Sequence, residues 1–235
     1  MSDESAVQVN FGRPMPVFPL DTVTLLPQQI LPLHIFEERY RQMVAHSLDG
    51  AGQIAMAMFE GADWTEQYHG TPPIRPAVCI GQIVEHQHLP DDRYNLLLQG
   101  VCRARIIEEH APDHERLYRE AILEPVGIQP GTGTHLDAFR AWLDGALEGS
   151  SLAEMTASAA VLEYARNTEI PTEALLEVVS FTMLNDSETR YHLLEEGDPD
   201  VRADYIRSQL DDLRTLIDTA RRQHPETWPK GCAWN

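Results

Sequence analysis

The segment from Pro14 to Leu48 constrains the fold most, because prolines interrupt its apolar runs and a helical pattern follows them. Proline cannot donate a backbone hydrogen bond to a sheet, so the runs 17–20 and 30–35 are predicted to be first or edge strands. Beyond these runs, apolar residues recur at the spacing of one helix face, at Phe36, Tyr40, Met43, Val44 and Leu48. The segment therefore predicts strand, loop, strand and then an amphipathic helix that packs through these side chains.

Two motifs stand out in this segment: the first is Val17-Phe18-Pro19-Leu20, and the second runs from Leu31 to Tyr40 as LPLHIFEERY. Together they resemble the opening signature of the Lon N-terminal domain family. That domain is the substrate-recognition part of Lon proteases and also occurs in stand-alone bacterial proteins. The resemblance implies a mainly structural role for the signature residues Pro32, Leu33, Phe36, Glu37, Arg39 and Tyr40. One position departs from the pattern: Gln28 stands where the family usually has glycine, which argues against a tight left-handed turn there.

A long β-hairpin is the next clear feature, because the apolar segments 78–89 and 93–109 are joined by a Pro-Asp-Asp turn. Gly100 lies within the second segment and predicts a bulge or bend that curls the sheet. Shorter apolar runs at 53–59 and 117–126 predict two further strands. The hairpin also resembles the Lon N-terminal family, in Gly81, Ile83, Leu89-Pro90-Asp91, Arg93-Tyr94-Asn95 and Leu97-Leu98-Gln99-Gly100. Over residues 14–126 the resemblance implies a closed β-barrel of the PUA-like type with one packed helix.

The chain changes character at residues 127–133, where glycine and proline are frequent and no periodicity continues. Beyond this linker, helical periodicity predicts a bundle whose last helix begins at Asp198-Pro199 and ends near His224 and Pro225. The predicted class is α+β, with a PUA-like β-barrel followed by a C-terminal helical bundle. The predicted boundaries are a flexible N-terminus at 1–13, the barrel at 14–126, the linker at 127–133, the helices at 134–224 and a tail at 225–235.

The formal net charge of −19 argues against two kinds of partner. A chain this acidic repels phosphate backbones and anionic lipid, so we expect neither nucleic acid nor a membrane surface to bind. No apolar run approaches the length of a membrane span, about 18 residues. The N-terminus is acidic and lacks the pattern of a signal peptide, so we expect a cytoplasmic protein. Cys79, Cys102 and Cys232 are widely spaced and are expected to be reduced thiols.

Motifs for catalysis are absent from the sequence. The single lysine, Lys230, is followed by Gly231, so there is no P-loop, and no lysine is placed to activate a serine nucleophile. No G-x-S-x-G elbow and no H-E-x-x-H zinc motif occur. His86 and His88 share a strand, but zinc needs four converging ligands, and surface histidines are the favoured interpretation. We therefore expect no enzyme activity, no metal and no cofactor; a cryptic hydrolase or a nucleic-acid-binding PUA-like protein are the alternatives.

The resemblance implies recognition: exposed or unfolded polypeptide segments as ligands, and a protease as a second kind of partner. The polar helix face carries Glu38, Arg41 and Gln42, which we predict as a polar rim for such contacts. In the loop that follows the third strand, Trp64 and Tyr68 have two interpretations: they pack over the strands, or they form an exposed aromatic binding loop. The acidic surface favours basic or neutral segments over acidic ones. The oligomeric state stays open.

Overall fold

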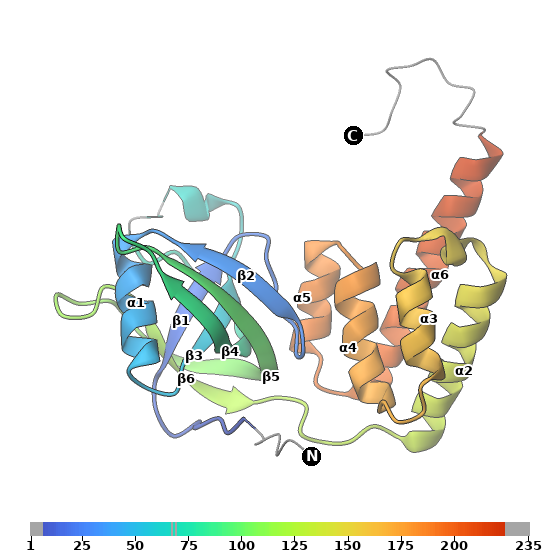
Figure 1. Ribbon diagram of the computed structural model, residues 1–235, viewed down its shortest axis with the longest axis horizontal. Coiled ribbons are helices and arrows are strands. Elements are labelled where there is room, and N and C mark those ends of the chain that lie inside the picture. The colour runs from blue at the N-terminus through green and yellow to red at the C-terminus, as the bar shows by residue number, and fades with distance from the viewer. Residues whose placement is uncertain (1–6, 67, 69, 224–235) are drawn as a thin grey trace. The chain divides into compact units, whose positions relative to one another are not determined.

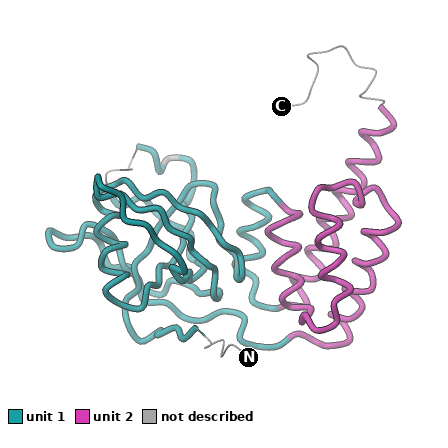
Figure 2. Tube along the Cα trace, viewed as in Figure 1, with its two compact units in different colours: residues 1–130, 185–198 teal, residues 131–184, 199–235 magenta. Residues whose placement is uncertain are grey.

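The computed structural model describes residues 7–66, 68 and 70–223. The chain divides into two compact units, which Figure 2 shows in different colours. The first unit is Met1–Pro130 with Asn185–Asp198, and the second is Gly131–Leu184 with Pro199–Asn235. The first break lies inside the segment predicted as a linker. The stretch 185–198, which the sequence analysis assigns to the helical part, belongs instead to the first unit, because its helix packs on the strands of that unit.

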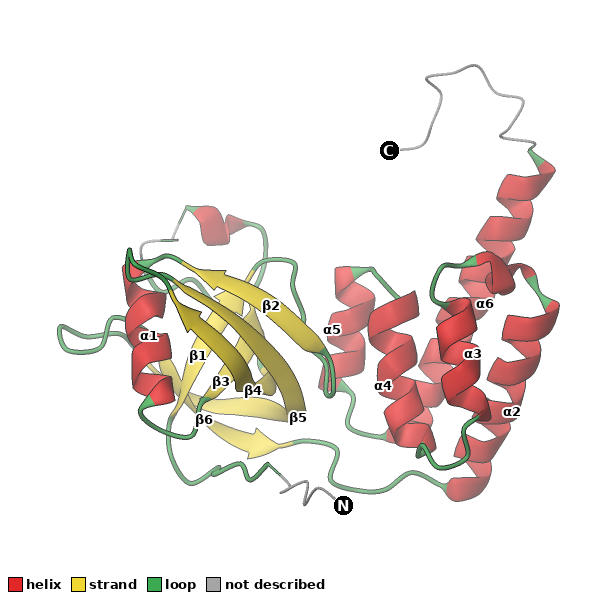
Figure 3. Ribbon diagram, viewed as in Figure 1, coloured by secondary structure: helices red, strands yellow, loops and turns green. Residues whose placement is uncertain are grey.

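The first unit is built on a six-stranded sheet, drawn in yellow in Figure 3. Its strands are β1 (Met15–Leu20), β2 (Ile30–Ile35), β3 (Gln53–Met58), β4 (Ala77–His88), β5 (Tyr94–His110) and β6 (Glu120–Pro125). They follow the order β2-β5-β4-β3-β1-β6, and β5 also pairs with β6. Only the pair β1–β3 is parallel among the pairs of these strands. The pairings therefore return to β1 as a ring of five strands, and β2 adds to β5 outside this ring.

Strand β5 has 17 residues, so it can pair with β4 and β6 of the ring and also with β2 outside it. Its first residues pair with β2 and its last residues with β6, while β4 runs along its other side. The predicted irregularity at Gly100 is present, since the register with β4 shifts between Gly81 and Ile80 and leaves one extra residue in β5. A Cβ at Gly100 would lie 2.1 Å from the carbonyl oxygen of Leu26. Glycine is therefore required for the close approach of the loop that precedes β2.

This loop contains the left-handed turn that the sequence argues against. Gln28 has a φ of 67°, and its backbone N–H donates to the carbonyl oxygen of Gly100 at 2.7 Å. Gly100 in turn donates to the carbonyl oxygen of Gln29 at 2.8 Å. These hydrogen bonds offset the cost of a left-handed non-glycine residue, which is about 1–2 kcal/mol. The prediction was therefore wrong, because tertiary hydrogen bonds fix the turn.

Helix α1 (Glu38–Leu48) follows β2 directly (Figure 1) and packs on β1 and β3. Tyr40, Met43 and Val44 are buried, as the helical pattern predicts. Phe36, which was expected in the core, is 61% exposed. Glu37 is still extended, with φ −69° and ψ 137°, so Phe36 keeps the two-residue alternation of β2 and lies on the solvent side with the exposed residues of that strand. The prediction for Phe36 was wrong because the helical period begins only after this residue.

One buried cluster of the first unit consists mainly of small and branched side chains from the ring of strands. Buried members of this cluster include Val17, Ala55, Ala57, Val78, Ile80, Ala104, Ala121 and Leu123. Phe59 and Ile74 extend it beyond the ends of the strands, where an isolated backbone bridge joins them. Alanine and valine side chains are small, so many of them can pack closely together in this cluster.

Helix α5 (Ser187–Glu195) completes the first unit by packing on β4 and β5. Asp186 caps the helix by accepting a hydrogen bond from the N–H of Thr189 at 2.8 Å. The guanidinium carbon of Arg75 lies 3.4 Å from the ring centre of Tyr191, whose hydroxyl accepts from the N–H of Ala77 at 2.9 Å. These contacts join α5 to the start of β4, where Ala77 lies 114 positions before Tyr191 in the chain.

The second unit contains α2 (Gly133–Gly149), the short 3-10 helix η2 (Ser151–Glu154), α3 (Ser158–Arg166), α4 (Thr172–Met183) and α6 (Pro199–Arg222). Helix α2 packs on α3, α4 and α6, and the fully buried side chains include Leu143, Leu152, Leu175 and Leu210. Helix α6 begins at Pro199 as predicted, whereas the predicted end residues His224 and Pro225 lie outside the described residues. Within the described part of the chain, every helix is too short or too polar to cross a membrane.

Candidate functional site

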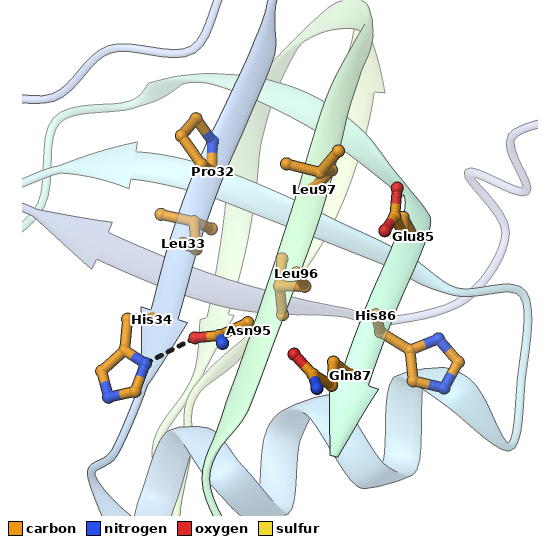
Figure 4. Close-up of a pocket in the computed structure, with 9 residues that line it drawn as sticks. All are labelled: Pro32, Leu33, His34, Glu85, His86, Gln87, Asn95, Leu96 and Leu97. Atoms are coloured by element: carbon orange, nitrogen blue, oxygen red, sulfur yellow. Dashed lines mark hydrogen bonds between the residues drawn. The ribbon is translucent and has the colours of Figure 1, made fainter. Parts of the chain in front are cut away.

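An open hollow of about 360 Å³ lies on the strands β2, β5 and β4 of the first unit (Figure 4). Two rows of side chains border it, each crossing the three strands in register. The rows are Pro32–Leu97–Glu85 and His34–Asn95–Gln87, with Leu33, Leu96 and His86 between them. Residues directly opposite one another on paired strands project to the same face of a sheet. Ile30 and Phe36 continue the alternation of exposed residues along and just beyond β2, and together with the two rows they define what we call the outer face.

The second row provides side-chain hydrogen-bonding groups. His34 Nδ1 and Asn95 Oδ1 are 2.7 Å apart and share the hydrogen bond that Figure 4 marks. Gln87 lies beside Asn95 on the neighbouring strand. The ring of Phe36 stacks on His34, with ring centroids 6.2 Å apart. Amide and imidazole groups can donate and accept hydrogen bonds, so this row can bind the peptide groups of a ligand.

The ends of the outer face are apolar and open to solvent. Ile30 is 55% exposed at one end of β2, and Phe36 is 61% exposed just beyond the other end. Val84 is about half exposed on β4, where the register with β5 slips between Ile83 and Glu85. Single exposed apolar side chains are common on protein surfaces, so the feature that suggests a partner here is their position at both ends of one hollow. Among the residues that line the hollow, Glu85 is the one carboxylate, and none is an arginine or a lysine.

Three signature residues, Glu37, Arg39 and Tyr40, join the start of α1 to the loop that contains Tyr68. Arg39 forms an ion pair with Glu37 at 3.0 Å and donates to the carbonyl oxygen of Tyr68 at 3.2 Å. The Tyr68 hydroxyl donates to the Glu37 carboxylate, and the Arg39 guanidinium lies 4.6 Å from both tyrosine rings. Burial raises the pKa of Tyr40, which keeps its hydroxyl neutral. Glu37, Arg39 and Tyr40 therefore stabilise the packing of the start of α1 against the loop. Pro32 and Leu33 of the same signature instead line the hollow.

The three helix residues predicted as a polar rim differ in their burial and in their contacts. Glu38 is exposed, whereas Arg41 and Gln42 are half-buried. The Gln42 amide binds a neighbouring loop with both ends: Nε2 donates to the carbonyl oxygen of Glu115 at 2.9 Å, and Oε1 accepts from the N–H of Leu117 at 2.7 Å. Gln42 therefore has a structural task that sequence spacing could not reveal.

The loop 60–77 includes a short 3-10 helix, η1 (Asp63–Thr65), and both of its predicted binding aromatics are half-buried against the core cluster. Trp64 stacks on Phe59 with ring centroids 4.7 Å apart and an interplanar angle of 3°. Tyr68 meets Trp64 edge-on, with centroids 5.7 Å apart. These contacts favour the packing interpretation over an exposed aromatic loop.

No three potential metal ligands come together in the part of the chain that the structure describes. His88 stacks on Tyr94 with centroids 4.6 Å apart and pairs with Asp92 at 3.3 Å. Cys79 and Cys102 are free thiols, and burial raises the pKa of the Cys102 thiol, which lowers its reactive thiolate fraction. Cys232 and Lys230 lie outside the described residues.

The residues of the outer face were not all found by sequence reasoning. Ile30, Glu85, Asn95 and Leu97 were placed on predicted strands but were not singled out as site residues. The available signal was the alternation in 30–36, where every second residue stays exposed. A hollow depends on the register of three strands, and the slip next to Glu85 sets that register. No pattern in one strand shows such a slip.

Comparison with known proteins gives a consistent family. Residues 14–212 match the family described as the ATP-dependent protease La (LON) substrate-binding domain. The Lon protease of Dictyoglomus thermophilum is 32% identical over 95 residues, which are 40% of this chain and 12% of that protein. The Lon protease of Trichlorobacter lovleyi is 29% identical over 116 residues, which are 48% of this chain and 14% of that protein. The chain thus aligns with only a small part of these relatives.

Solved structures agree at the level of the fold. The N-terminal domain of the Mycobacterium avium complex Lon protease superposes with a TM-score of 0.63 at 15% identity, over 83% of this chain and 96% of that chain. A Lon N-terminal domain protein from Xanthomonas campestris superposes with a TM-score of 0.57 at 18% identity, over 83% of this chain and 98% of that chain. The chain therefore belongs to the family of the ATP-dependent protease La (LON) substrate-binding domain.

Proposed function

We propose that the chain is a non-catalytic recognition module that binds exposed or unfolded segments of other polypeptides at the outer face. Membership of a family described as substrate-binding supports recognition rather than chemistry. The observation that carries the proposal is the exposure of Ile30 and Phe36 at the two ends of a hollow with few charges. Apolar ends provide contact area, and the amide row between them provides sequence-independent hydrogen bonds. An affinity near micromolar, about −8 kcal/mol, suits such transient binding.

Three finer features belong to the same proposal. The ring of strands is proposed to be a closed PUA-like barrel, and the helices of the second unit a bundle. A protease is proposed as a partner that receives the bound polypeptide. The chain itself is proposed to carry neither ATPase nor protease chemistry, so the purified protein should hydrolyse no ATP and cleave no casein. Turnover that survives Lys230→Ala would contradict this last point, because the sequence offers no other lysine.

The test is a titration of a labelled, reduced and unfolded test protein with the parent chain and two double variants. In the first variant, Ile30→Ser and Phe36→Ser remove the apolar ends of the outer face. In the control, Ile107→Ser and Ile128→Ser remove residues of the same unit that are 61% and 77% exposed. We expect the first variant to weaken binding at least about tenfold, and the control to bind like the parent.

The results of this titration show whether the polypeptide binds at the outer face or at a second surface. Equal weakening by both variants would indicate unspecific adhesion, and no weakening by the first would place binding elsewhere. The second proposed surface is the group predicted from the sequence, namely Glu38, Arg41, Gln42, Trp64 and Tyr68. It is the weaker candidate, because Gln42, Trp64 and Tyr68 make internal contacts. Charge reversal at Glu38 and Arg41 tests it without disturbing the packed aromatics.

A further inference from the structure

We propose that the outer face selects extended segments of about seven residues that carry apolar side chains at both ends and one arginine or lysine between them. This inference rests on the proposed function and names the class of polypeptide that the site takes. Glu85 is the specificity-determining residue. The ligand is a segment of another polypeptide, identified by charge complementarity to Glu85 and by the apolar ends of the outer face.

The length of the segment follows from strand geometry. Ile30 and Phe36 mark the apolar ends of the outer face along β2. An extended chain rises about 3.3 Å per residue, so these ends are about 20 Å apart, which is the distance between the first and last residues of a ligand segment of about seven residues. Apolar side chains at the two ends of such a segment can reach Ile30 and Phe36 together. A helical ligand of the same number of residues would span less than half this distance.

The ligand is expected to lie over the face of the strands and not to add to the sheet edge. β2 is the strand at one end of the sheet order, and Pro32 lies near the middle of this strand. Proline has no N–H to donate, and it blunts an edge strand against pairing with another chain. The His34, Asn95 and Gln87 groups instead offer hydrogen bonds from above the face.

The charge preference follows from the surroundings of Glu85. Within the described residues, no hydrogen bond or ion pair engages the Glu85 carboxylate, and no arginine or lysine lines the hollow. Glu85 is also the one acidic residue among those that line the hollow, so it sets the sign of the fixed charge there. Strands are about 4.8 Å apart, so Glu85 on β4 lies about 10 Å from β2, within reach of a long basic side chain that crosses β5. An arginine or lysine of the ligand would therefore provide an ion-pair partner for the Glu85 carboxylate.

The experiment uses the full chain and fluorescein-labelled peptides that differ at one position. Each peptide has leucines at its first and seventh positions and uncharged polar residues elsewhere, with arginine, citrulline or glutamate at the third position, so that these side chains project to the same side of the extended peptide. Citrulline keeps the shape of arginine and removes its charge. At low salt we expect the arginine peptide to bind about threefold to fivefold more tightly than the citrulline peptide in fluorescence anisotropy, the range for an exposed ion pair. Glu85→Gln should abolish this difference, and Glu85→Lys should transfer the preference to the glutamate peptide.

The control is Glu124→Gln, which removes an exposed carboxylate from β6 of the same unit. It should keep the preference for arginine, and higher salt should reduce that preference in the parent chain. If parent and Glu85→Gln discriminate equally, or the parent does not discriminate, the inference is wrong while the proposed function stands. If no peptide binds to the parent, or binding ignores Ile30→Ser with Phe36→Ser, the proposed function of the outer face fails as well.

Discussion

Arg103 on β5 donates a hydrogen bond from Nε to the carbonyl oxygen of Leu193 in α5, at 3.0 Å. Ninety positions separate the two residues along the chain, and Arg103 is only 6% exposed. A buried guanidinium is costly unless its donors are satisfied, so the helix that supplies this carbonyl is part of the first unit in energetic terms. The contact explains why residues 185–198 leave the helical part of the sequence and join the strands.

Substituting Arg103 should therefore lower the stability of the first unit. Arg103→Met leaves the buried Leu193 carbonyl without this donor, and we expect the free energy of unfolding to fall by about 1–3 kcal/mol. Urea denaturation followed by far-ultraviolet circular dichroism measures the change. Arg105→Met, at an exposed position of the same strand, is the matched control and should change stability by less than about 0.5 kcal/mol. Equal effects of the two substitutions would contradict the role assigned to Arg103.

Replacing each of two glycines by alanine should change the stability of the protein in opposite directions. A Cβ at Gly100 would meet the Leu26 carbonyl oxygen, so Gly100→Ala should destabilise the first unit by about 1–3 kcal/mol. Gly145 lies exposed inside α2, and a Cβ added there would have no neighbouring atom within 4 Å, so Gly145→Ala should stabilise the second unit by about 0.5–1 kcal/mol. Thermal unfolding of the two variants measures both effects. A neutral Gly100→Ala would show that the loop before β2 can move away.

The cap of α5 should make stability depend on pH. The hydrogen bond from the Thr189 N–H holds the pKa of Asp186 below its ordinary value. A carboxyl whose pKa is lowered on folding contributes stability above its unfolded pKa, near 3.9, and loses it as pH falls through the folded value. Asp186→Ala should cost about 1 kcal/mol at neutral pH and progressively less under acidic conditions. Asp186→Asn keeps a capping oxygen without titration, so its stability should not share this acid-dependent loss.

The aromatic contact of Trp64 gives a prediction that separates packing from binding. Because Trp64 stacks on Phe59, Trp64→Ala should lower the free energy of unfolding by about 1–3 kcal/mol. Glu38→Lys, at an exposed position of α1, should leave stability nearly unchanged. Chemical denaturation of both variants, alongside ligand titration, distinguishes the two roles. Unchanged stability of Trp64→Ala with weaker polypeptide binding would favour the exposed-loop interpretation instead.

The local patterns of the sequence were sufficient to predict most strands and helices of the first unit. Proline positions, the Pro-Asp-Asp turn and mid-strand Gly100 are properties of short segments, so the strands and the bulge could be predicted from them. The limits of α1 were harder to predict, since a two-residue and a 3.6-residue period overlap at Phe36. Backbone conformation at Glu37 decides which period applies, and only the folded chain shows it.

By itself, the sequence determined the family, the strand and helix order and the absence of familiar catalytic motifs, because these depend on residue type and near-neighbour spacing. Tertiary structure alone decided that Gln28 takes a left-handed turn, that α5 belongs to the sheet, and that Gln42 and Trp64 face inward. It also decided that Pro32, Leu97 and Glu85 form one row. Each of these depends on hydrogen bonds and strand register between distant segments, and such interactions leave no periodic signal in the chain.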